Sequence, residues 1–410
     1  MDSDITLFAA PAFLLCILME LAVDRRRKTH YYRMNDAFGS LALGIMSKTS
    51  GLITFSLGTW VVHTLVSPWS LNTWDGSNPW VYVGMFVLFD FVYYWSHRFR
   101  HEINFLWAGH SIHHSSEDYN LTTALRQTSS SLFVWIFAVP AFLLGAPLET
   151  WLVCGAWNLI YQFWVHTRHI NKLGPIEWVM VTPSHHRVHH AQNARYIDKN
   201  HGGVFIIWDR LFGTFAEEVD EEEIIYGVRR PLHSLNPIVA NLQVWRSLAS
   251  DAWHTTSWRD KLRIWFMPTG WRPEDLTISR PMTKTDLSKF EKFDPSYGSA
   301  QGRYAFMLLV ISGLTGTIFL LENSQLNTAW NLIAWCFLSA PLIVGAMLLQ
   351  GQNIKSEGIR LLASWPVFLV LQIHLDDLSR GVLGAGLCLT SLAWLVLYFY
   401  KPQTALGEAS

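Results

Sequence analysis

Long apolar stretches, separated by shorter polar ones, run along most of the chain. A membrane-spanning helix needs about 20 predominantly apolar residues, and about nine stretches approach that length. They are residues 5–23, 37–66, 80–96, 129–144, 148–166, 304–321, 328–349, 361–374 and 381–400. The stretch at 37–66 is long enough to be bent or to form two pieces. This pattern predicts an all-α, polytopic transmembrane protein with about nine spans.

The positions of the basic residues predict how these spans are oriented. The first apolar stretch is followed at once by the run DRRRK at 24–28, whereas the segments expected outside hold one basic residue, Arg380. Lys and Arg gather on the cytoplasmic side of membrane proteins. We therefore expect an integral, multi-pass protein with its N-terminus outside and its polar block at about 167–303 in the cytoplasm. The membrane would be the endoplasmic reticulum in a eukaryote and the inner or plasma membrane in a bacterium.

The composition agrees with a membrane protein. Charged residues make up 15% of the chain, and there are 21 tryptophans; soluble domains are about a quarter charged, and tryptophan is enriched at membrane interfaces. The net charge of −1 gives no indication of nucleic-acid binding. The four cysteines form no CxxC pair, so zinc ribbons and disulfide frameworks are not expected.

Nine histidines have spacings that suit metal binding. They form an HxxxH motif, two HxxHH motifs and one lone histidine at the end of the fifth apolar stretch. On a helix, residues three or four apart share one face. Imidazole suits Fe, Zn, Cu and Ni, and one metal takes about three to six ligands, so this set predicts two metals at the cytoplasmic face. The candidate ligands are His97, His101, His110, His113, His114, His166, His186, His189 and His190.

The remaining histidines are interpreted differently. His169 and His185 lie beside the motifs, and both direct ligation and a supporting role are open for them. The isolated histidines are expected to be packed or interfacial residues. They include His30, His201, His233, His254 and His374.

Three carboxylates are the candidate catalytic residues outside the histidine motifs. Asp90 precedes His97 by seven residues, two helical turns, and so shares its face. It is expected either to hold the second ring nitrogen of a ligand or to lie near the water boundary. Glu117 and Asp118 directly follow the second motif and are expected to orient imidazoles or to complete the coordination. Residues 198–200 are expected to form a turn over the site.

The order of the motifs resembles the fatty acid hydroxylase and sterol desaturase superfamily of membrane di-iron oxygenases. The flanking words SSEDYNL, YIDKN and WDRLFGTF are similar to the branch that acts on alkylglycerol ether lipids. The resemblance covers about residues 90–215. It implies that the nine histidines hold two Fe ions, without showing which histidine binds which ion.

The resemblance also implies a reaction. The enzyme would use O2 to hydroxylate the carbon next to the ether oxygen of an alkylglycerol, a membrane lipid, and so release a fatty aldehyde. Tetrahydrobiopterin is implied as the reductant, although no pterin motif is visible. The physiological electron donor and the oligomeric state stay open.

Two alternatives are carried alongside. One is an oxygenase of the same superfamily that acts on a sterol, a carotenoid or a fatty acyl chain. The other is a polytopic metal transporter, which would place its histidines inside the spans along a pore. Here the histidines lie mainly at span ends and in cytoplasmic segments, which favours an oxygenase.

The chain is expected to have four parts. They are N-terminal spans over 1–78, a hydroxylase-type catalytic region over 79–216, a cytoplasmic polar segment over 217–303 and C-terminal spans over 304–410.

Overall fold

The computed structural model describes residues 5–129, 134–282, 284–322 and 326–399. Regular structure in these ranges is helical, with only isolated β-bridges between segments, which confirms the all-α prediction. The chain divides into two compact units, one formed by residues 1–234 and 238–294 and the other by residues 235–237 and 295–410.

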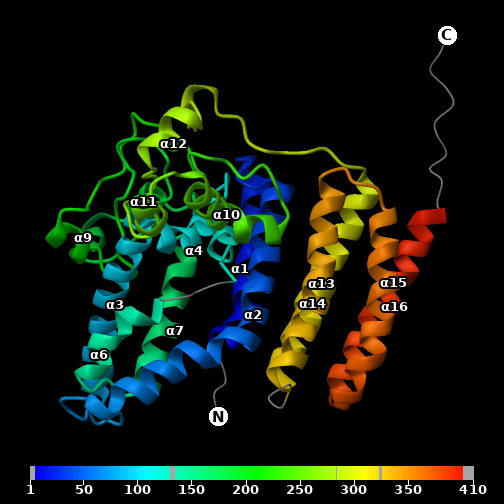
Figure 1. Ribbon diagram of the computed structural model, residues 1–410, viewed down its shortest axis with the longest axis horizontal. Coiled ribbons are helices and arrows are strands. Elements are labelled where there is room, and N and C mark those ends of the chain that lie inside the picture. The colour runs from blue at the N-terminus through cyan, green and yellow to red at the C-terminus, as the bar shows by residue number, and fades with distance from the viewer. Residues whose placement is uncertain (1–4, 130–133, 283, 323–325, 400–410) are drawn as a thin grey trace. The chain divides into compact units, whose positions relative to one another are not determined.

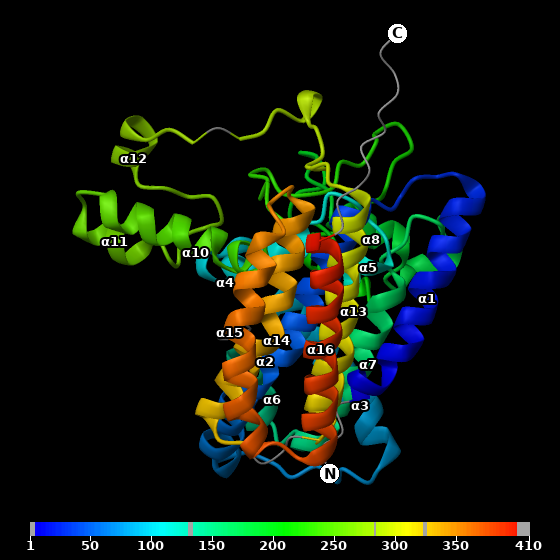
Figure 2. The ribbon, with the colours of Figure 1, turned by 90° about the vertical axis from the view of Figure 1, so that its right-hand side faces the viewer.

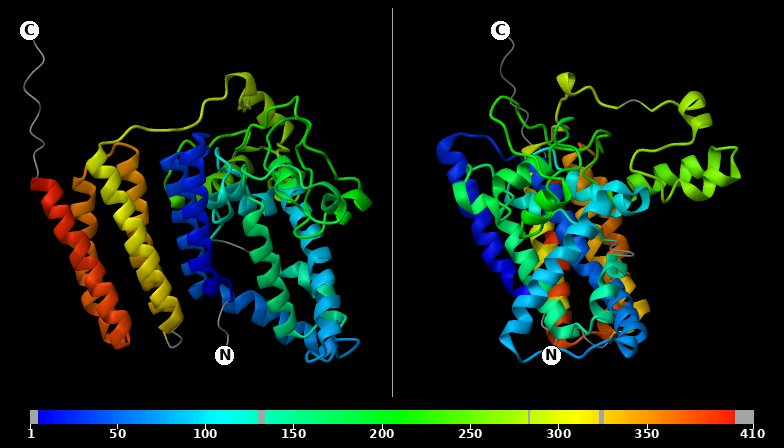
Figure 3. Two further views of the ribbon diagram at one scale, coloured as in Figure 1. Left: turned by 180° about the vertical axis from the view of Figure 1, so that it is seen from behind. Right: turned by 90° about the vertical axis from the view of Figure 1, so that its left-hand side faces the viewer.

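Long helices form the body of the first unit, and most of the shorter ones gather at one end of it, while α6 (Val139–Leu143) lies at the other (Figure 1). The long helices are α1 (Ile5–Arg27), α2 (Met34–Val66), α3 (Pro79–Glu102) and α7 (Leu148–Trp164). Helices α3 and α7 pack against each other, and α1 packs against α7. The shorter helices at the end are α4 (Asn104–His114), α5 (Leu121–Ala124), α8 (Pro183–His189), α9 (Ile207–Phe212), α10 (Pro237–His254), α11 (Trp258–Arg263) and α12 (Glu274–Ser279). The right-hand view of Figure 3 shows α10 and α11 extending to one side of the long helices.

Short 3-10 helices occur in the connections. They are η1 (Ser67–Trp69), η2 (Val134–Ala138), η3 (Gly174–Trp178), η4 (Leu287–Lys289) and η5 (Gln372–His374).

The joint between α3 and α4 turns the chain back on itself. Ile103 has extended backbone dihedrals, so the helix stops there and restarts in a new direction. The first N–H groups of a helix have no partner within it. In α4 they donate to another segment of the unit, Asn104 to the carbonyl of Met267 and Phe105 to that of Trp265, both at 3.0 Å. The second histidine motif is thereby held against the first.

The apolar stretch at 129–144 does not form the single spanning helix that its composition predicts. Its described part consists of η2 and of the five-residue helix α6 (Val139–Leu143), while residues 130–133 lie outside the described ranges. Such helices are far shorter than the roughly 20 residues that a span needs. The stretch at 37–66, by contrast, lies within the continuous 33-residue helix α2.

The second unit is a bundle of four helices (Figure 2). They are α13 (Ser299–Glu322), α14 (Thr328–Leu349), α15 (Lys355–Leu371) and α16 (Asp377–Phe399). Among the described residues, three segments are long and apolar enough to cross a membrane: Ser299–Leu321, Ala329–Leu349 and Asp377–Phe399. These segments agree with a membrane protein. The number of nine spans and the cytoplasmic side stay predictions.

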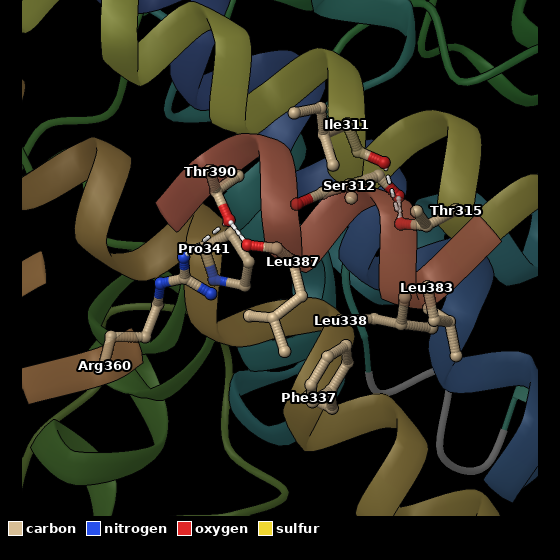
Figure 4. A pocket seen from close by; sticks show the side chains of 11 residues that line it. Ile311, Ser312, Thr315, Phe337, Leu338, Pro341, Arg360, Leu383, Leu387 and Thr390 are labelled. Atoms are coloured by element: carbon tan, nitrogen blue, oxygen red, sulfur yellow. Dashed lines mark hydrogen bonds between the residues drawn. The ribbon is translucent and has the colours of Figure 1, made fainter. Parts of the chain in front are cut away.

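A buried ion pair lies inside this bundle. Arg360 donates to both carboxylate oxygens of Glu357, at 2.6 and 2.7 Å, and the Tyr304 hydroxyl also donates to this carboxylate. Glu357 has no exposed surface, and Arg360 is 8% exposed. Figure 4 shows Arg360 and Thr390 beside a cavity of about 20 Å³, which has room for about one water molecule. The pair is therefore shielded from bulk solvent.

We predict that Arg360→Met destabilises the protein by about 3–5 kcal/mol, because it leaves the Glu357 carboxylate buried without its partner. The double variant Glu357→Gln/Arg360→Met should recover much of this loss. The melting temperature of the detergent-solubilised protein measures both effects. Arg380→Met, at a side chain that is 44% exposed, is the control. An Arg360→Met protein that melts like the wild type would contradict the prediction.

Candidate metal centre

All nine histidines that the motifs single out come together in the first unit, in two groups. Within each group the ring nitrogens that could hold a metal lie within 4.8 Å of one another. The histidines lie in or just beyond α3, α4, α7 and α8, and every one of them is buried. The first group is His97, His101, His110, His114 and His189, and the second is His113, His166, His186 and His190.

Backbone carbonyls hold the Nδ1 atoms of four of these rings. A carbonyl oxygen only accepts hydrogen bonds, so each of these Nδ1 atoms must donate. A neutral imidazole then carries its lone pair on Nε2. The carbonyl partners therefore fix the tautomer that presents Nε2 to the centre of each group. The four contacts are His97 with the carbonyl of His201 at 2.8 Å, His113 with Arg126 at 3.1 Å, His166 with Gln162 at 2.8 Å and His189 with Lys199 at 2.9 Å.

The Nε2 atoms within each group face one another at short range. In the second group, Nε2 of His166 lies 3.3 Å from that of His113 and 3.0 Å from that of His186. In the first group, Nε2 of His97 lies 2.9 Å from that of His110. For His113 and His166 both tautomers are fixed, so two lone pairs point at each other. This arrangement is repulsive unless a cation lies between them.

The spacing of these nitrogens also suits a metal. Nitrogens bound about 2.0–2.1 Å from one ion lie about 2.8–3.4 Å apart in octahedral or tetrahedral geometry. The observed separations of 2.9–3.3 Å fall within that range. Each group thus has the donor chemistry and the spacing to hold one metal ion.

Burial keeps the rings in the neutral form that a metal requires. The pKa of His113 falls to about 4, mainly because burial disfavours its charged form. Burial is also the main cause that lowers the pKa of His186 and His190 well below the usual value, and neighbouring histidines add to the effect. At neutral pH these rings are unprotonated, and metal binding does not have to displace a proton from them.

Asp90 has a different set of partners from the one expected from its spacing. Its carboxylate accepts hydrogen bonds from the backbone N–H groups of Val204 and Phe205, at 2.8 and 3.0 Å, and from the side chains of Asn158 and Trp208, at 2.7 and 2.9 Å. None of these donors is an imidazole. Asp90 therefore anchors the segment 204–208 against α3, and this segment follows the residue whose carbonyl holds His97.

Glu117 and Asp118 likewise pair with cations and backbone rather than with imidazoles. Asp118 accepts from Arg33 at 2.9–3.1 Å and from Lys292 at 2.7 Å. Glu117 accepts from the backbone N–H of Phe293 at 2.6 Å and lies 3.6 Å from a guanidinium nitrogen of Arg33. These carboxylates fasten the segment around residue 293 to the start of α2. Both metal groups consist of nitrogen donors alone.

The turn at 198–200 lies over the site as the sequence indicates. Asp198 and Asn200 have left-handed backbone conformations, with φ of 57° and 55°, which Asp and Asn tolerate better than most residues. The carbonyl of Lys199 holds His189. The Asn200 side chain donates to the carbonyls of His185 and Ala216. The turn thus positions a ring of the first group.

His201 is a residue of the site that the sequence interpretation missed. It has no exposed surface, and its ring centre lies 5.0 Å from that of His101, 5.6 Å from that of His189 and 5.7 Å from that of His97. His201 lies in a loop and has no motif spacing to the other histidines. The signal near it in the sequence is the pair of glycines that follows: a Cβ at Gly203 would lie 2.8 Å from Asp90, so this close approach requires glycine.

The other histidines lie outside the two groups. The Nδ1 atom of His185 accepts from the backbone N–H of Thr182 and helps to cap α8. His169 packs near Tyr31 and lies 3.9 Å from an Asp24 oxygen. Neither occupies a ligand position in the structure. His30, His233, His254 and His374 also belong to neither group.

Comparison with known proteins places this site in a family. The profile of the fatty acid hydroxylase family matches residues 82–214, which include all nine histidines. The alkylglycerol monooxygenase of Xenopus tropicalis is 38% identical over 311 residues, covering 73% of this chain and 67% of the relative. For the Homo sapiens protein of that name the identity is 40% over 274 residues, covering 65% and 59%. The ornithine lipid hydroxylase OlsE of Rhizobium tropici is 30% identical over 199 residues, covering 46% and 60%. No solved structure matches the chain.

We predict that Asp90→Ala lowers the stability of the protein by at least about 3 kcal/mol, because it leaves several buried donors without an acceptor. Asp90→Asn should lose less, since its amide oxygen still accepts. Thermal melting of the purified protein measures the loss. Asp377→Ala, at a side chain that is 98% exposed, is the matched control and should change the melting temperature little. Equal melting of Asp90→Ala and Asp377→Ala would show that Asp90 is not an anchor.

Proposed function

Because this chain belongs to the family of the alkylglycerol monooxygenases, among the fatty acid hydroxylases, we propose that it oxidises alkylglycerol ether lipids at a membrane. The observation that carries the proposal is the pair of buried histidine groups inside the region that matches the hydroxylase family. The fold adds apolar helices of spanning length, as an enzyme with a lipid substrate requires.

Two iron ions are proposed as the metals. Five imidazoles would hold one ion and four the other, with the first and second groups as their ligand sets. Imidazole suits several metals, among them Fe, Zn and Cu. Iron is preferred here because the family's hydroxylation chemistry needs a metal that changes oxidation state. When bound, the iron supplies the activation of O2, which side chains alone do not provide.

The proposed reaction inserts one oxygen atom into the C–H bond next to the ether oxygen. The other oxygen atom of O2 leaves as water, with two electrons and two protons from a reductant. The hydroxylated carbon is a hemiacetal, which collapses to a fatty aldehyde and a free glycerol hydroxyl. The chain's own contribution is a dry, fixed site, since each of the nine rings is 7% exposed or less and carbonyls fix four tautomers.

The proposed place for the alkyl chain is an apolar groove between α3 and α7 of about 350 Å³. Its lining has the chemistry for a hydrocarbon tail, and one lining residue, Phe205, belongs to the segment that Asp90 anchors beside the site. The groove is lined by Tyr82, Val83, Phe86, Val87, Val153, Cys154, Trp157 and Phe205.

A tetrahydropterin is the proposed reductant, and the cytoplasm is the proposed side of the histidine site. The pterin rests on the family alone, because no pterin motif is visible in the sequence. The side rests on the basic residues Arg25, Arg26 and Arg27 in the last turn of α1. The catalytic region at 79–216 is likewise a proposal, as are the N-terminal spans, the polar segment and the C-terminal spans expected around it.

We predict that the purified protein binds two iron ions per chain. His166→Ala should reduce this to about one, because it removes one of four ligands from the second group and leaves the first group intact. Metal analysis by mass spectrometry measures the content, and His374→Ala, which lies in the second unit, is the control. Full metal content in His166→Ala would refute the ligand assignment.

We predict that membranes containing the protein release fatty aldehyde from an alkylglycerol when O2 and reduced pterin are supplied. Omitting either should abolish the release. Release of aldehyde in the absence of pterin would support the proposed reaction but would show that the pterin is not the reductant. An iron-loaded protein that releases no aldehyde, but hydroxylates a sterol or fatty acyl lipid instead, would reject the alkylglycerol substrate.

A further inference from the structure

His201 is a buried imidazole whose ring nitrogens make no hydrogen bond of ordinary geometry, apart from a weaker contact with the backbone of Asp198. Both Nδ1 and Nε2 lack a partner of ordinary geometry, and the side chain has no exposed surface. Leaving a buried polar group unpaired costs about 1–3 kcal/mol. Such a group in a native protein calls for an explanation, and a catalytic or ligand-binding role is one of the usual ones.

The backbone of His201 is fixed while its ring stays unpaired. Its N–H donates to Asp209 at 2.7 Å, and its carbonyl holds the His97 ring at 2.8 Å. The next N–H, of Gly202, also donates to Asp209 at 2.7 Å. The ring is therefore held at the first group by main-chain contacts on both sides.

The position of the ring distinguishes it from the five ligands. His201 is not among the residues whose ring nitrogens all lie within 4.8 Å of one another. Its ring centre nevertheless lies 5.0–5.7 Å from those of His97, His101 and His189. An ion held by these five imidazoles would have room for a further small ligand. A ring just outside the ligand set can reach a molecule bound there without ligating the metal.

We propose that His201 is a hydrogen-bond partner for a small molecule or anion that binds the metal of the first group. This inference rests on the proposed iron centre and adds a binding residue to it. A neutral imidazole carries one N–H donor and one lone-pair acceptor, so it can pair with either kind of atom. Its pairing would also remove the cost of the two unpaired ring nitrogens.

The test measures the affinity of azide for the oxidised, iron-loaded protein. The azide-to-iron absorption band reports how much azide is bound. His201→Phe keeps an aromatic ring but has no ring nitrogen. It should retain two iron ions and bind azide about tenfold more weakly or worse, as expected for the loss of one hydrogen bond to a charged partner. His201→Gln keeps an N–H donor and should recover part of the affinity. His169→Phe, outside both groups, should bind azide like the wild type.

Each other outcome overturns the inference in a recognisable way. Unchanged azide affinity in His201→Phe with two iron ions bound would show that the ring does not touch the bound anion. Loss of one iron ion in both His201 variants would make His201 a ligand itself. A wild-type protein that binds no iron would reject the proposed function together with this inference.

Discussion

The site depends on lone pairs that the backbone forces to point at one another. Carbonyl oxygens take the Nδ1 hydrogens of His113 and His166, and their Nε2 atoms then face each other at 3.3 Å. Two neutral rings in that arrangement repel unless a cation separates them. Burial prevents the alternative of protonating one ring, since the pKa of His113 falls to about 4. The main-chain carbonyls thus hold the two rings in an arrangement that a bound cation would stabilise.

Buried carboxylates support this arrangement indirectly, by holding the segments whose carbonyls contact the rings. Asp209 and Asp90 hold the loop from His201 to Trp208, which supplies the carbonyl for His97. Because these carboxylates bind backbone and side-chain donors and no imidazole, the two histidine groups stay neutral, and a bound metal ion would keep its charge. Removing one of the carboxylates would then act on a bound metal only through the position of a carbonyl. Losses of metal affinity of about 10–100-fold are typical of such supporting contacts.

The sequence predicted which residues share a helix face, but it did not predict the contacts between segments that are far apart in the chain. The HxxxH and HxxHH spacings place rings on one helical face, and the structure brings those rings together. The seven-residue spacing placed Asp90 on the face of His97, yet its partners come from α7 and from a segment more than 100 residues later. His201 was missed for the same reason. The apolar run at 129–144 was misread because hydropathy records composition and not where a helix ends.

Substrate choice must come from outside the histidine groups, because the same ligands would serve any lipid oxidation. Each buried methylene contributes about 0.8 kcal/mol, so a long alkyl tail supplies most of the binding free energy. That energy is nearly uniform along the tail and does not select one carbon. In the proposed arrangement, the selected carbon would be the one that lies at the histidine groups when the polar headgroup has reached the end of the apolar groove. With the alkyl tail in the groove as proposed, the groove would decide which tails bind, and the contacts of the headgroup outside it would decide which carbon is oxidised.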